Sequence, residues 1–338
     1  MMTIKRGIVA LALVALSVNV SSAQTLKTVK EHGHLDCGVS QGLRGFSATN
    51  DKGEWSGLDV DFCRALAAAI FNDATKVQFV PLSSEDRFSA LQSKKVDVLS
   101  RNSTWTMGRE TSLGLIFAAV TYYDGQGFMV RNALNIESAL ELADKSICTK
   151  SGTTSELNLA DYFRNNRLTY KVLTFPSADE ALKAYEGGRC DALTSDVSQL
   201  YALRTELATP RDHIILPDII SKEPLGPVVR QDDFQWLNIV KWTLFAMINA
   251  DELGVDRENL DEAMKSQNPS IRRLLGLEGD FGQQLGLTND WAARVIRLVG
   301  NYGEVFERYV GTGSKLGIPR GINQLWNKGG IQYAPPIR

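Results

Sequence analysis

The sequence predicts an α/β protein built from two doubly wound lobes. Three observations predict this class: strand-like and helix-like segments alternate from residue 34 onward, the alternation runs through twice, and a local motif recurs in both runs. Such alternation is typical of a mostly parallel sheet that is covered by helices. The chain has 338 residues, which is long enough for two lobes of this kind.

The first 23 residues have the features of a secretory signal peptide. Lys5 and Arg6 give a positive start, residues 7–20 are apolar, and residues 21–23 (Ser-Ser-Ala) form a small-residue cleavage pattern. The apolar run is shorter than the ~20 residues that a membrane span needs. We therefore expect cleavage after Ala23 and a periplasmic protein, without a lipid anchor because no cysteine follows.

The charge balance excludes two classes of partner. The chain has 37 Lys and Arg against 39 Asp and Glu, and residues 1–23 contain two of the basic residues and no acidic one. The mature chain of 315 residues thus has 35 basic against 39 acidic residues, a formal charge near −4. This balance favours neither nucleic acid nor a polybasic membrane contact.

The apolar residues 234–250 are short and interrupted by Lys241, so we predict a core helix there.

Four cysteines in an exported chain predict disulfide bonds. Three pairings are possible, and the choice that is local in sequence is Cys37–Cys63 with Cys148–Cys190, one bond in each lobe. A metal site is the alternative. The chain has no Cys-x-x-Cys motif and only three histidines, so we expect neither a metal nor a cofactor.

Residues 35–132 hold the first run of alternating segments. Short apolar stretches predict strands, and longer stretches with apolar residues at helical spacing predict helices. A serine and a nearby acid mark the start of the helix at residues 83–94. We predict strands at residues 35–39, 76–82, 96–100, 115–123 and 127–132, and helices at residues 56–71 and 83–94.

The second run begins after Asn132 and repeats this layout. One of its helices ends at a glycine pair, which is typical of a helix C-terminus. We predict helices at residues 137–144, 153–166 and 177–188, a strand and turn at residues 146–152, and strands at residues 170–176 and 190–196.

A local motif supports the internal repeat. FSALQSKKVDVLSRN and EALKAYEGGRCDALTSD each contain Ala-Leu, a helix, a turn and an aspartate that heads a short strand. Asn102 lies five residues after Asp97, and Asp196 lies five residues after Asp191. Both polar residues fall at the carboxyl end of a strand, where ligands bind in open α/β sheets.

The residues at these strand ends suit a free α-amino acid. One lobe offers Asn102, Thr104 and Arg109, and the other offers Asp196. An arginine can donate two parallel bonds to a carboxylate, and an ionised aspartate can accept from an ammonium group. Two plainer roles stay open: a surface loop position for Arg109, and the N-cap of a helix at residues 197–207 for Asp196.

Residues 151–156 (Ser-Gly-Thr-Thr-Ser-Glu) predict a helix start that can bind an anion. Gly152 permits close approach of the backbone, and Thr153 and Glu156 have the spacing of a capping box. The free N–H groups of such a start attract a carboxylate. A plain helix cap is the alternative role for Thr153.

Taken together, residues from about 35 to 250 resemble the solute-binding proteins of polar amino-acid ATP-binding-cassette (ABC) transporters. This resemblance implies the type II periplasmic-binding-protein fold, with crossover strands between the lobes near residues 128–132 and 220–227. The motifs that carry it, in order behind the signal peptide, are Gly57-Leu58-Asp59-Val60-Asp61-Phe62, Ala90-Leu91-Gln92 with Val96-Asp97, Asn102-Ser103-Thr104-Trp105-Thr106 with Arg109-Glu110, Tyr122-Tyr123, Lys150-Ser151-Gly152-Thr153, and Cys190-Asp191-Ala192 with Asp196.

The same resemblance implies a function and site roles. Arg109 would clamp the α-carboxylate of the ligand and Asp196 would hold its α-ammonium group. The implied partners are an L-amino acid and an inner-membrane ABC permease, and we expect a monomer. The residues expected to assist are Asn102, Thr104, Thr153 and Thr154.

Two departures from the family pattern affect the expected specificity. Relatives usually carry aromatic rings after the first and second strands, where this chain has Leu43, Arg44 and Ser84. If these residues form the pocket wall, the pocket is roomier and its specificity broad. The chain is also longer than short family members and resembles the general L-amino-acid-binding proteins.

The expected domain order follows from the fold that the resemblance implies. Residues 1–23 form the leader, residues 24–130 the first part of lobe 1, residues 131–222 lobe 2, and residues 223–338 the return to lobe 1 with a C-terminal helical extension. Within the extension, apolar residues at helical spacing predict one amphipathic helix at residues 291–310, packed on the first lobe.

Three other functions compete with broad amino-acid capture. A binding protein for a single amino acid would use the same clamp. An exported dehydratase-like enzyme on this fold needs a placed acid or base; Glu85 and Asp86 are candidates, although a helix start also explains them, and His213 lies apart from any triad. A sensor input domain is disfavoured because no membrane segment or signalling domain follows.

Overall fold

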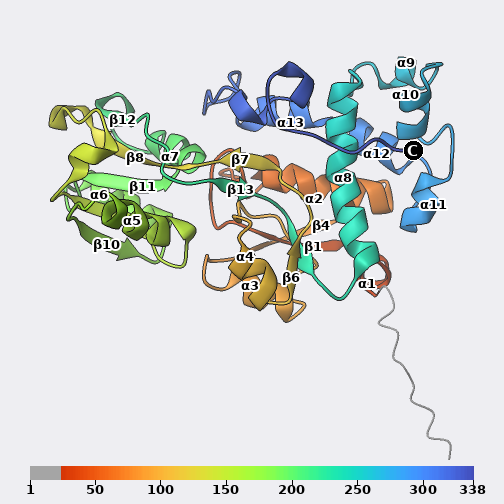
Figure 1. Ribbon diagram of the computed structural model, residues 1–338. Helices are drawn as coiled ribbons and strands as arrows, with labels where there is room; N and C mark the ends of the chain where they lie inside the picture. Colours follow the sequence, from red (N-terminus) through yellow and green to blue (C-terminus); the bar gives the residue numbers. More distant parts are fainter. Residues whose placement is uncertain (1–23) are drawn as a thin grey trace, which may run out of the picture.

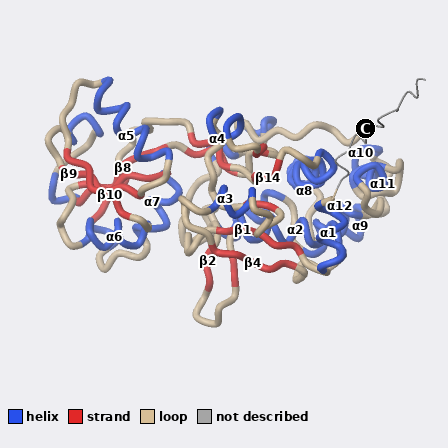
Figure 2. The backbone as a smooth tube through the Cα atoms, turned by 90° about the horizontal axis from the view of Figure 1, so that it is seen from below, coloured by secondary structure: helices blue, strands red, loops and turns tan. Residues whose placement is uncertain are grey.

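Two lobes lie side by side in the computed structural model, which describes residues 24–338 (Figures 1 and 2). The expected leader at residues 1–23 lies outside the described residues. Each lobe contains a five-stranded sheet, with strand order β4-β1-β5-β14-β6 in the first lobe and β10-β9-β11-β8-β12 in the second. In both, three parallel strands are followed by a strand that runs antiparallel to them. This repeated topology is the type II periplasmic-binding fold that the sequence predicts.

The first lobe combines the N-terminal third of the chain with its C-terminal third. Its strands are β1 (Leu35–Val39), β2 (Ala48–Thr49), β3 (Trp55–Ser56), β4 (Val77–Pro81), β5 (Val98–Leu99), β6 (Leu115–Phe117) and β14 (Val228–Arg230). Its helices are α1 (Thr25–His32), α2 (Leu58–Phe71), α3 (Arg87–Gln92), α4 (Met107–Ser112), α8 (Phe234–Glu252), α9 (Leu260–Ala263), α10 (Pro269–Leu274), α11 (Phe281–Leu285), α12 (Trp291–Leu298) and α13 (Tyr302–Tyr309).

The second lobe is formed by the middle of the chain. Its strands are β8 (Gln126–Arg131), β9 (Ser146–Lys150), β10 (Lys171–Phe175), β11 (Ala192–Asp196) and β12 (His213–Ile215). Its helices are α5 (Thr154–Asn165), α6 (Ala178–Glu186) and α7 (Val197–Arg204).

Two short antiparallel strands connect the lobes. β7 (Tyr122–Asp124) pairs with β13 (Glu223–Leu225), and both run between the lobes in Figure 1. The second crossover lies within the expected residues 220–227, but the first does not lie at residues 128–132. Those residues belong to β8 in the second sheet, where Phe128 and Val130 are buried in the core of lobe 2. The expected division after residue 130 therefore falls inside a strand of lobe 2.

Three predicted elements differ from the structure. The helix expected from residue 83 starts at Arg87, because the Ser83 hydroxyl accepts from the N–H of Asp86 and holds residues 83–86 in a turn. The strand expected at residues 115–123 is divided into β6 and β7. The helix expected at residues 137–144 is a single 3-10 segment over residues 139–142.

The amphipathic helix predicted at residues 291–310 is two helices. Gly300 has a left-handed φ of 112°, which ends α12. Asn301 then starts α13 in a capping box, since its side chain accepts from the N–H of Glu304 while the Glu304 carboxylate accepts from the N–H of Asn301. The Gly-Asn-x-x-Glu pattern at this point carries the signal for the break.

The C-terminal extension covers helix α2. α2 is buried on nearly its whole circumference, because one face meets the sheet and another meets α12 and α13. Its apolar residues accordingly lie on more than one face, and its two buried aspartates, Asp59 and Asp61, are bonded to Asn102 and Arg308. The Arg308 guanidinium of α13 pairs with Asp61 of α2 at 2.7 Å. Beyond α2, the Tyr302 hydroxyl donates to the carbonyl of Thr121. The extension thus packs on the first lobe.

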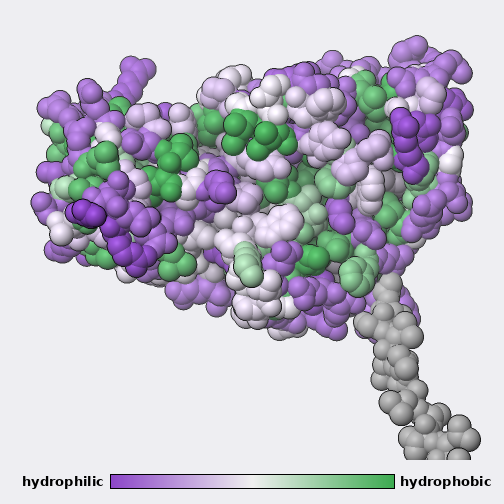
Figure 3. All heavy atoms as spheres, in the orientation of Figure 1, coloured by the Kyte–Doolittle hydropathy of each residue, from purple (hydrophilic) through white to green (hydrophobic). Residues whose placement is uncertain are grey.

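The surface carries no broad apolar region on the face shown in Figure 3, where hydrophilic residues predominate and apolar ones form small groups. Between residues 24 and 338, no helix has both the length and the apolar character that crossing a membrane requires.

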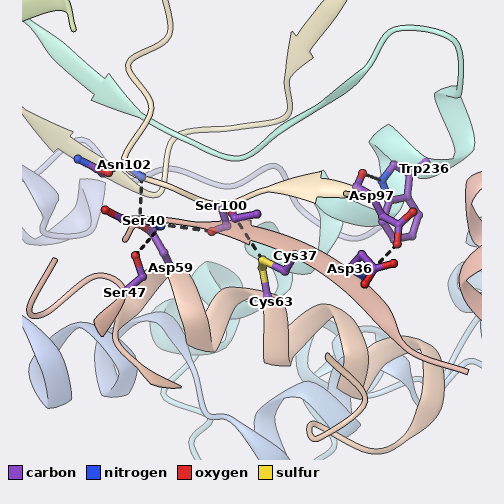
Figure 4. Close-up of a disulfide and its surroundings, with 11 residues drawn as sticks. Asp36, Cys37, Ser40, Ser47, Asp59, Cys63, Asp97, Ser100, Asn102 and Trp236 are labelled. Carbon is purple, nitrogen blue, oxygen red and sulfur yellow. Dashed lines mark hydrogen bonds between the residues drawn. A yellow bond between two sulfur atoms is a disulfide. The ribbon is translucent and has the colours of Figure 1, made fainter. Parts of the chain in front are cut away.

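Both expected disulfide bonds are present, one in each lobe. Cys37–Cys63 ties β1 to α2 (Figure 4), and Cys148–Cys190 ties β9 to the segment just before β11. The bonds close loops of 26 and 42 residues in sequence separation. A disulfide bond that closes a loop of this size stabilises a fold mainly by restricting the conformations of the unfolded chain.

We predict that replacing Cys148 and Cys190 by alanine destabilises lobe 2 selectively, by about 2–4 kcal/mol. All six tryptophans lie outside residues 131–222, so tryptophan fluorescence reports on lobe 1 alone. When this variant unfolds in urea, the unfolding transition followed by circular dichroism should begin at a lower urea concentration than the transition followed by fluorescence. The double alanine variant at Cys37 and Cys63 is the matched control, because it should shift the fluorescence transition. Coincident, unshifted transitions in the first variant would contradict the prediction.

Candidate functional site

A polar cavity lies between the lobes, at the carboxyl ends of strands from both sheets. Parallel strands point their carboxyl ends at one edge, so the segments after β1, β5, β9 and β11 meet there. The residues that line the cavity are Ser40, Ser84, Arg87, Arg101, Asn102, Thr104, Arg109, Lys150, Thr153, Thr154, Ser155, Ser195, Asp196 and Gln199.

The lobes are closed over this cavity. Arg44 of lobe 1 pairs with Glu206 of lobe 2 at 2.9 Å, and the Ser151 hydroxyl of lobe 2 donates to Glu85 of lobe 1 at 3.1 Å. Gly152 has a φ of 68°, and a Cβ there would lie 3.0 Å from the Glu85 side chain. The space open to the centre of a water-sized sphere is about 20 Å³, enough for about one water molecule. Because residues of both lobes enclose the cavity, a ligand can enter only when the lobes separate.

Arg109 lies in this cavity and is partly buried, so it is not a surface loop residue. It lies in the first turn of α4, whose start Thr106 caps by accepting from the N–H of Arg109. Its guanidinium donates to the carbonyl of Thr104 at 2.8 Å and lies 5.3 Å from the centre of the Phe88 ring. Burial lowers the pKa of Arg109, and the carboxylates of Glu223 and Asp196 oppose this effect. One edge of the guanidinium is therefore fixed by the protein.

Asp196 faces the cavity and does not cap α7 with its side chain. The cap is supplied by Asp124 on β7, whose carboxylate accepts from the N–H groups of Gly125 and Ser198. Burial raises the pKa of Asp196 well above its usual range, and the neighbouring acids Asp124 and Glu223 raise it further. Burial also raises the pKa of Asp124 to about 6. The Asp196 carboxylate is thus left available for a cationic group.

Thr104 and Thr154 come from different lobes and meet at one acid, Glu223. The carboxylate of Glu223 accepts from Thr104 Oγ1 at 2.5 Å and from Thr154 Oγ1 at 2.9 Å, both at the same oxygen. Its second oxygen accepts from Asn158 and Ser221, each at 2.6 Å. Both threonines line the cavity as expected, but their hydroxyl protons are directed to Glu223. Sequence reasoning missed this acid of the crossover strand.

Asn102 lies at the end of β5 with its main-chain N–H already bonded. That N–H donates to Asp59 on α2 at 3.0 Å, and the hydroxyl of Ser100 approaches the same carboxylate (Figure 4). Burial raises the pKa of Asp59 to about 6. Asn102 has a left-handed φ of 32°, and its side-chain oxygen has no hydrogen-bond partner. Its amide group, not its main chain, is what this residue offers to the cavity.

Thr153 precedes α5 but does not form the expected capping box. Its hydroxyl donates to the carbonyl of Lys150 at 2.7 Å, and its side chain makes no capping hydrogen bond to the helix start. Thr153, Thr154 and Ser155 all line the cavity. The first turn of α5 therefore presents uncapped N–H groups beside the cavity, an arrangement that attracts anions.

The expected pocket wall is correct at one position and wrong at the other two. Ser84 lines the cavity, where its hydroxyl accepts from Arg101 at 3.2 Å. Leu43 is buried in the core of lobe 1, because the loop after β1 turns inward at Phe46 and pairs Leu43 with Ser47. Arg44 lies at the rim between the lobes. The site is consequently compact and polar, not the roomier pocket that missing aromatic rings suggest.

Three cations of the cavity were missed by sequence reasoning: Arg87, Arg101 and Lys150. Arg101 had a signal, since it directly precedes Asn102 at the strand end. Arg87 had another, because Arg87, Ala90 and Leu91 share one buried face of α3 at helical spacing. An arginine in such a stripe is unusual unless it is paired or meets a ligand.

The residues considered as catalytic acids or bases, or as metal ligands, do not meet in this cavity. Glu85 and Asp86 are exposed and absent from its lining. His213 bonds to the Tyr185 hydroxyl at 2.7 Å in lobe 2. Across residues 24–338, no three side chains of the metal-ligating types gather closely enough to hold an ion.

Comparison with known proteins agrees with this architecture. Residues 35–255 match the family model of the bacterial extracellular solute-binding proteins, family 3. The general L-amino acid-binding periplasmic protein AapJ of Rhizobium johnstonii is 58% identical over 329 residues, which are 97% of this chain and 96% of AapJ. The glutamate/glutamine/aspartate/asparagine-binding protein BztA of Rhodobacter capsulatus is 51% identical over 97% of each chain.

A solved structure shares nearly the whole fold. An ABC transporter periplasmic binding protein from Brucella ovis, with glutathione bound, is 57% identical and superposes with a TM-score of 0.92, covering 93% of this chain and 99% of its own. A cysteine-binding protein from Campylobacter jejuni, 25% identical, matches 73% of this chain with a TM-score of 0.61. The larger coverage of the first structure includes the C-terminal extension. The chain belongs to the bacterial extracellular solute-binding proteins, family 3.

Proposed function

We propose that the protein captures L-α-amino acids in the periplasm and delivers them to an inner-membrane ABC permease. One observation carries this proposal: Arg109 and Asp196, which come from different lobes, line one cavity together with the uncapped start of α5. The cavity thus offers separate positions for an anionic and a cationic group. A free α-amino acid has these two groups on one carbon.

The chemistry of each position fits one end of such a ligand. Arg109 can donate two parallel bonds to the α-carboxylate, and the N–H groups at the start of α5 can add to them. Asp196 accepts from the α-ammonium group when it is ionised. Closing the lobes excludes water and strengthens both interactions, since charges attract more strongly at low dielectric constant.

The names of the relatives support several ligands over one. AapJ is a general L-amino acid-binding protein, BztA is named for four amino acids, and the Brucella ovis protein holds glutathione. We therefore infer that this protein accepts several L-amino acids, is exported by its leader, and acts as a monomeric binding protein without catalysis. A protein specific for one ligand, or an exported dehydratase-like enzyme, is the alternative.

Closure of the lobes couples binding to transport. A ligand that bonds to both lobes stabilises the closed form by its differential affinity for that form. Glu223 assists closure, because the Thr104 and Thr154 hydroxyls that it holds belong to opposite lobes. Separation of the lobes must lengthen at least one of these bonds. We propose that the permease recognises the closed form.

The function is tested by calorimetric titration of protein that has been unfolded, freed of ligand and refolded. We expect several L-amino acids to bind, and D-enantiomers and the α-decarboxylated amines to be silent, because the amines lack the group for Arg109. In Arg109→Ala the affinity should fall at least a hundredfold, about 3 kcal/mol or more. Wild-type affinity in this variant would overturn the site assignment, and amino-acid turnover would favour the enzyme.

The pH dependence of binding should follow Asp196. Since burial raises the pKa of Asp196 and the ligand binds its ionised form, binding must release a proton wherever the free carboxyl is still protonated. The affinity for L-glutamine should therefore rise with pH and fall, by up to tenfold per unit, below the raised pKa. Asp196→Asn is the control, whose residual slope reports Asp124. A flat profile from pH 5 to pH 8 in the wild type would contradict this.

Glu223→Gln should weaken closure and leave recognition intact. The amide retains one acceptor oxygen where the carboxylate holds four donors, so the closed form loses hydrogen bonds. We expect a larger radius of gyration in X-ray scattering and a similar loss of affinity, about three- to tenfold, for every ligand. Glu206→Gln, at the exposed rim, should change little. An unchanged radius with affinity lost for one ligand alone would refute a closure role.

A further inference from the structure

Arg87 is a buried cation that has no hydrogen-bond or ion-pair partner among the described residues. Its side chain is 3% exposed and lines the cavity, yet within residues 24–338 it makes no hydrogen bond or ion pair, and its Nε is fully shielded. Its nearest notable contact is the Phe88 ring, 4.8 Å from the guanidinium carbon. Burial of an unpaired charge is costly, so such a group indicates an anionic occupant.

The neighbouring acids are engaged by other groups. Asp59 accepts from the N–H of Asn102, Asp124 caps α7, and Glu223 holds four donors. Asp196 remains, and it is the acceptor for the ammonium group of the ligand. None of these carboxylates bonds to Arg87.

The other cations of the cavity differ in how far they are satisfied. Arg101 donates to the carbonyl of Leu82 and to the hydroxyl of Ser84. Lys150, at the end of β9 in the opposite lobe, lines the cavity, and burial together with Arg101 and Arg87 lowers its pKa to about 8. An anion beside Lys150 would stabilise its charged form. The zwitterionic head of an amino acid is matched by Arg109 and Asp196 and leaves Arg87 and Lys150 uncompensated.

We propose that Arg87, assisted by Lys150, binds a second acidic group on the ligand side chain. This inference rests on the proposed function and names its substrate class: α-amino acids with a terminal carboxylate, such as L-glutamate, and peptides linked through that end that keep a free carboxylate. The second acid also joins the lobes, because Arg87 lies on α3 of lobe 1 and Lys150 on β9 of lobe 2. Acidic ligands therefore favour closure at two points.

L-Glutamate and L-glutamine form the test pair, because they differ at the side-chain end and hardly in shape. In calorimetric titrations of the full mature chain, Arg87→Gln should lower the affinity for L-glutamate at least tenfold. The affinity for L-glutamine should stay within about twofold of the wild-type value. Arg87→Lys should restore part of the L-glutamate affinity. Lys150→Gln, like Arg87→Gln, should lower the affinity for L-glutamate more than the affinity for L-glutamine. Arg164→Gln, an exposed site on α5, is the control for net charge.

Each outcome has a defined meaning. Equal losses for both ligands in a variant with wild-type circular dichroism and melting would place Arg87 on the α-carboxylate and overturn the inference, as would wild-type L-glutamate affinity. Failure of the proposed function looks different, since wild-type protein would then bind neither ligand. In that case both proposals are wrong, whereas a selective effect of Arg87→Gln supports both.

Discussion

The Glu223 carboxylate is the interaction on which the closed arrangement depends. It lies on a crossover strand, is 1% exposed, and accepts from donors of both lobes and of the crossover itself. Because a carboxylate has room for about four donors, one side chain can fix Thr104 and α5 relative to each other. The positions of Arg109 and of the α5 start follow from that fixed point. The site is therefore assembled beside the two strands that connect the lobes.

Buried charge is the second constraint. Three arginines and a lysine share a cavity with one free aspartate, and the other acids nearby are bonded to backbone or hydroxyl groups. Such an arrangement is costly without an occupant, since desolvation disfavours each charge. A ligand with both charge types relieves this cost only in the closed form. The same electrostatics thus favours recognition and closure together.

Many features of the fold and of the candidate site could be predicted from the sequence. The strand ends at Asn102 and Asp196, the disulfide pairs and the cavity position of Arg109 follow from local patterns and the repeated β-α-β order. The family resemblance implied the cavity position of Thr154. The division of residues 291–310 also had a local signal, the Gly-Asn-x-x-Glu pattern at Gly300, which the prediction of one helix overlooked. The inward turn of Leu43 had none, because it depends on how the loop after β1 packs in lobe 1.

Two site residues needed tertiary information. Glu223 is remote in sequence from the threonines that it holds, so only the crossover pairing brings them together. Arg87 lay in a predicted helix, where periodicity gives the buried face but not what that face meets.

The most direct measurement is a crystal structure of the refolded protein grown with L-glutamate. We predict that the α-carboxylate lies on Arg109 and the start of α5, and the α-ammonium group on Asp196. We also expect the Thr104–Glu223–Thr154 bonds to be kept. A ligand bound in the reverse orientation, or outside the cavity with Arg109 and Asp196 unoccupied, would contradict this mode of binding.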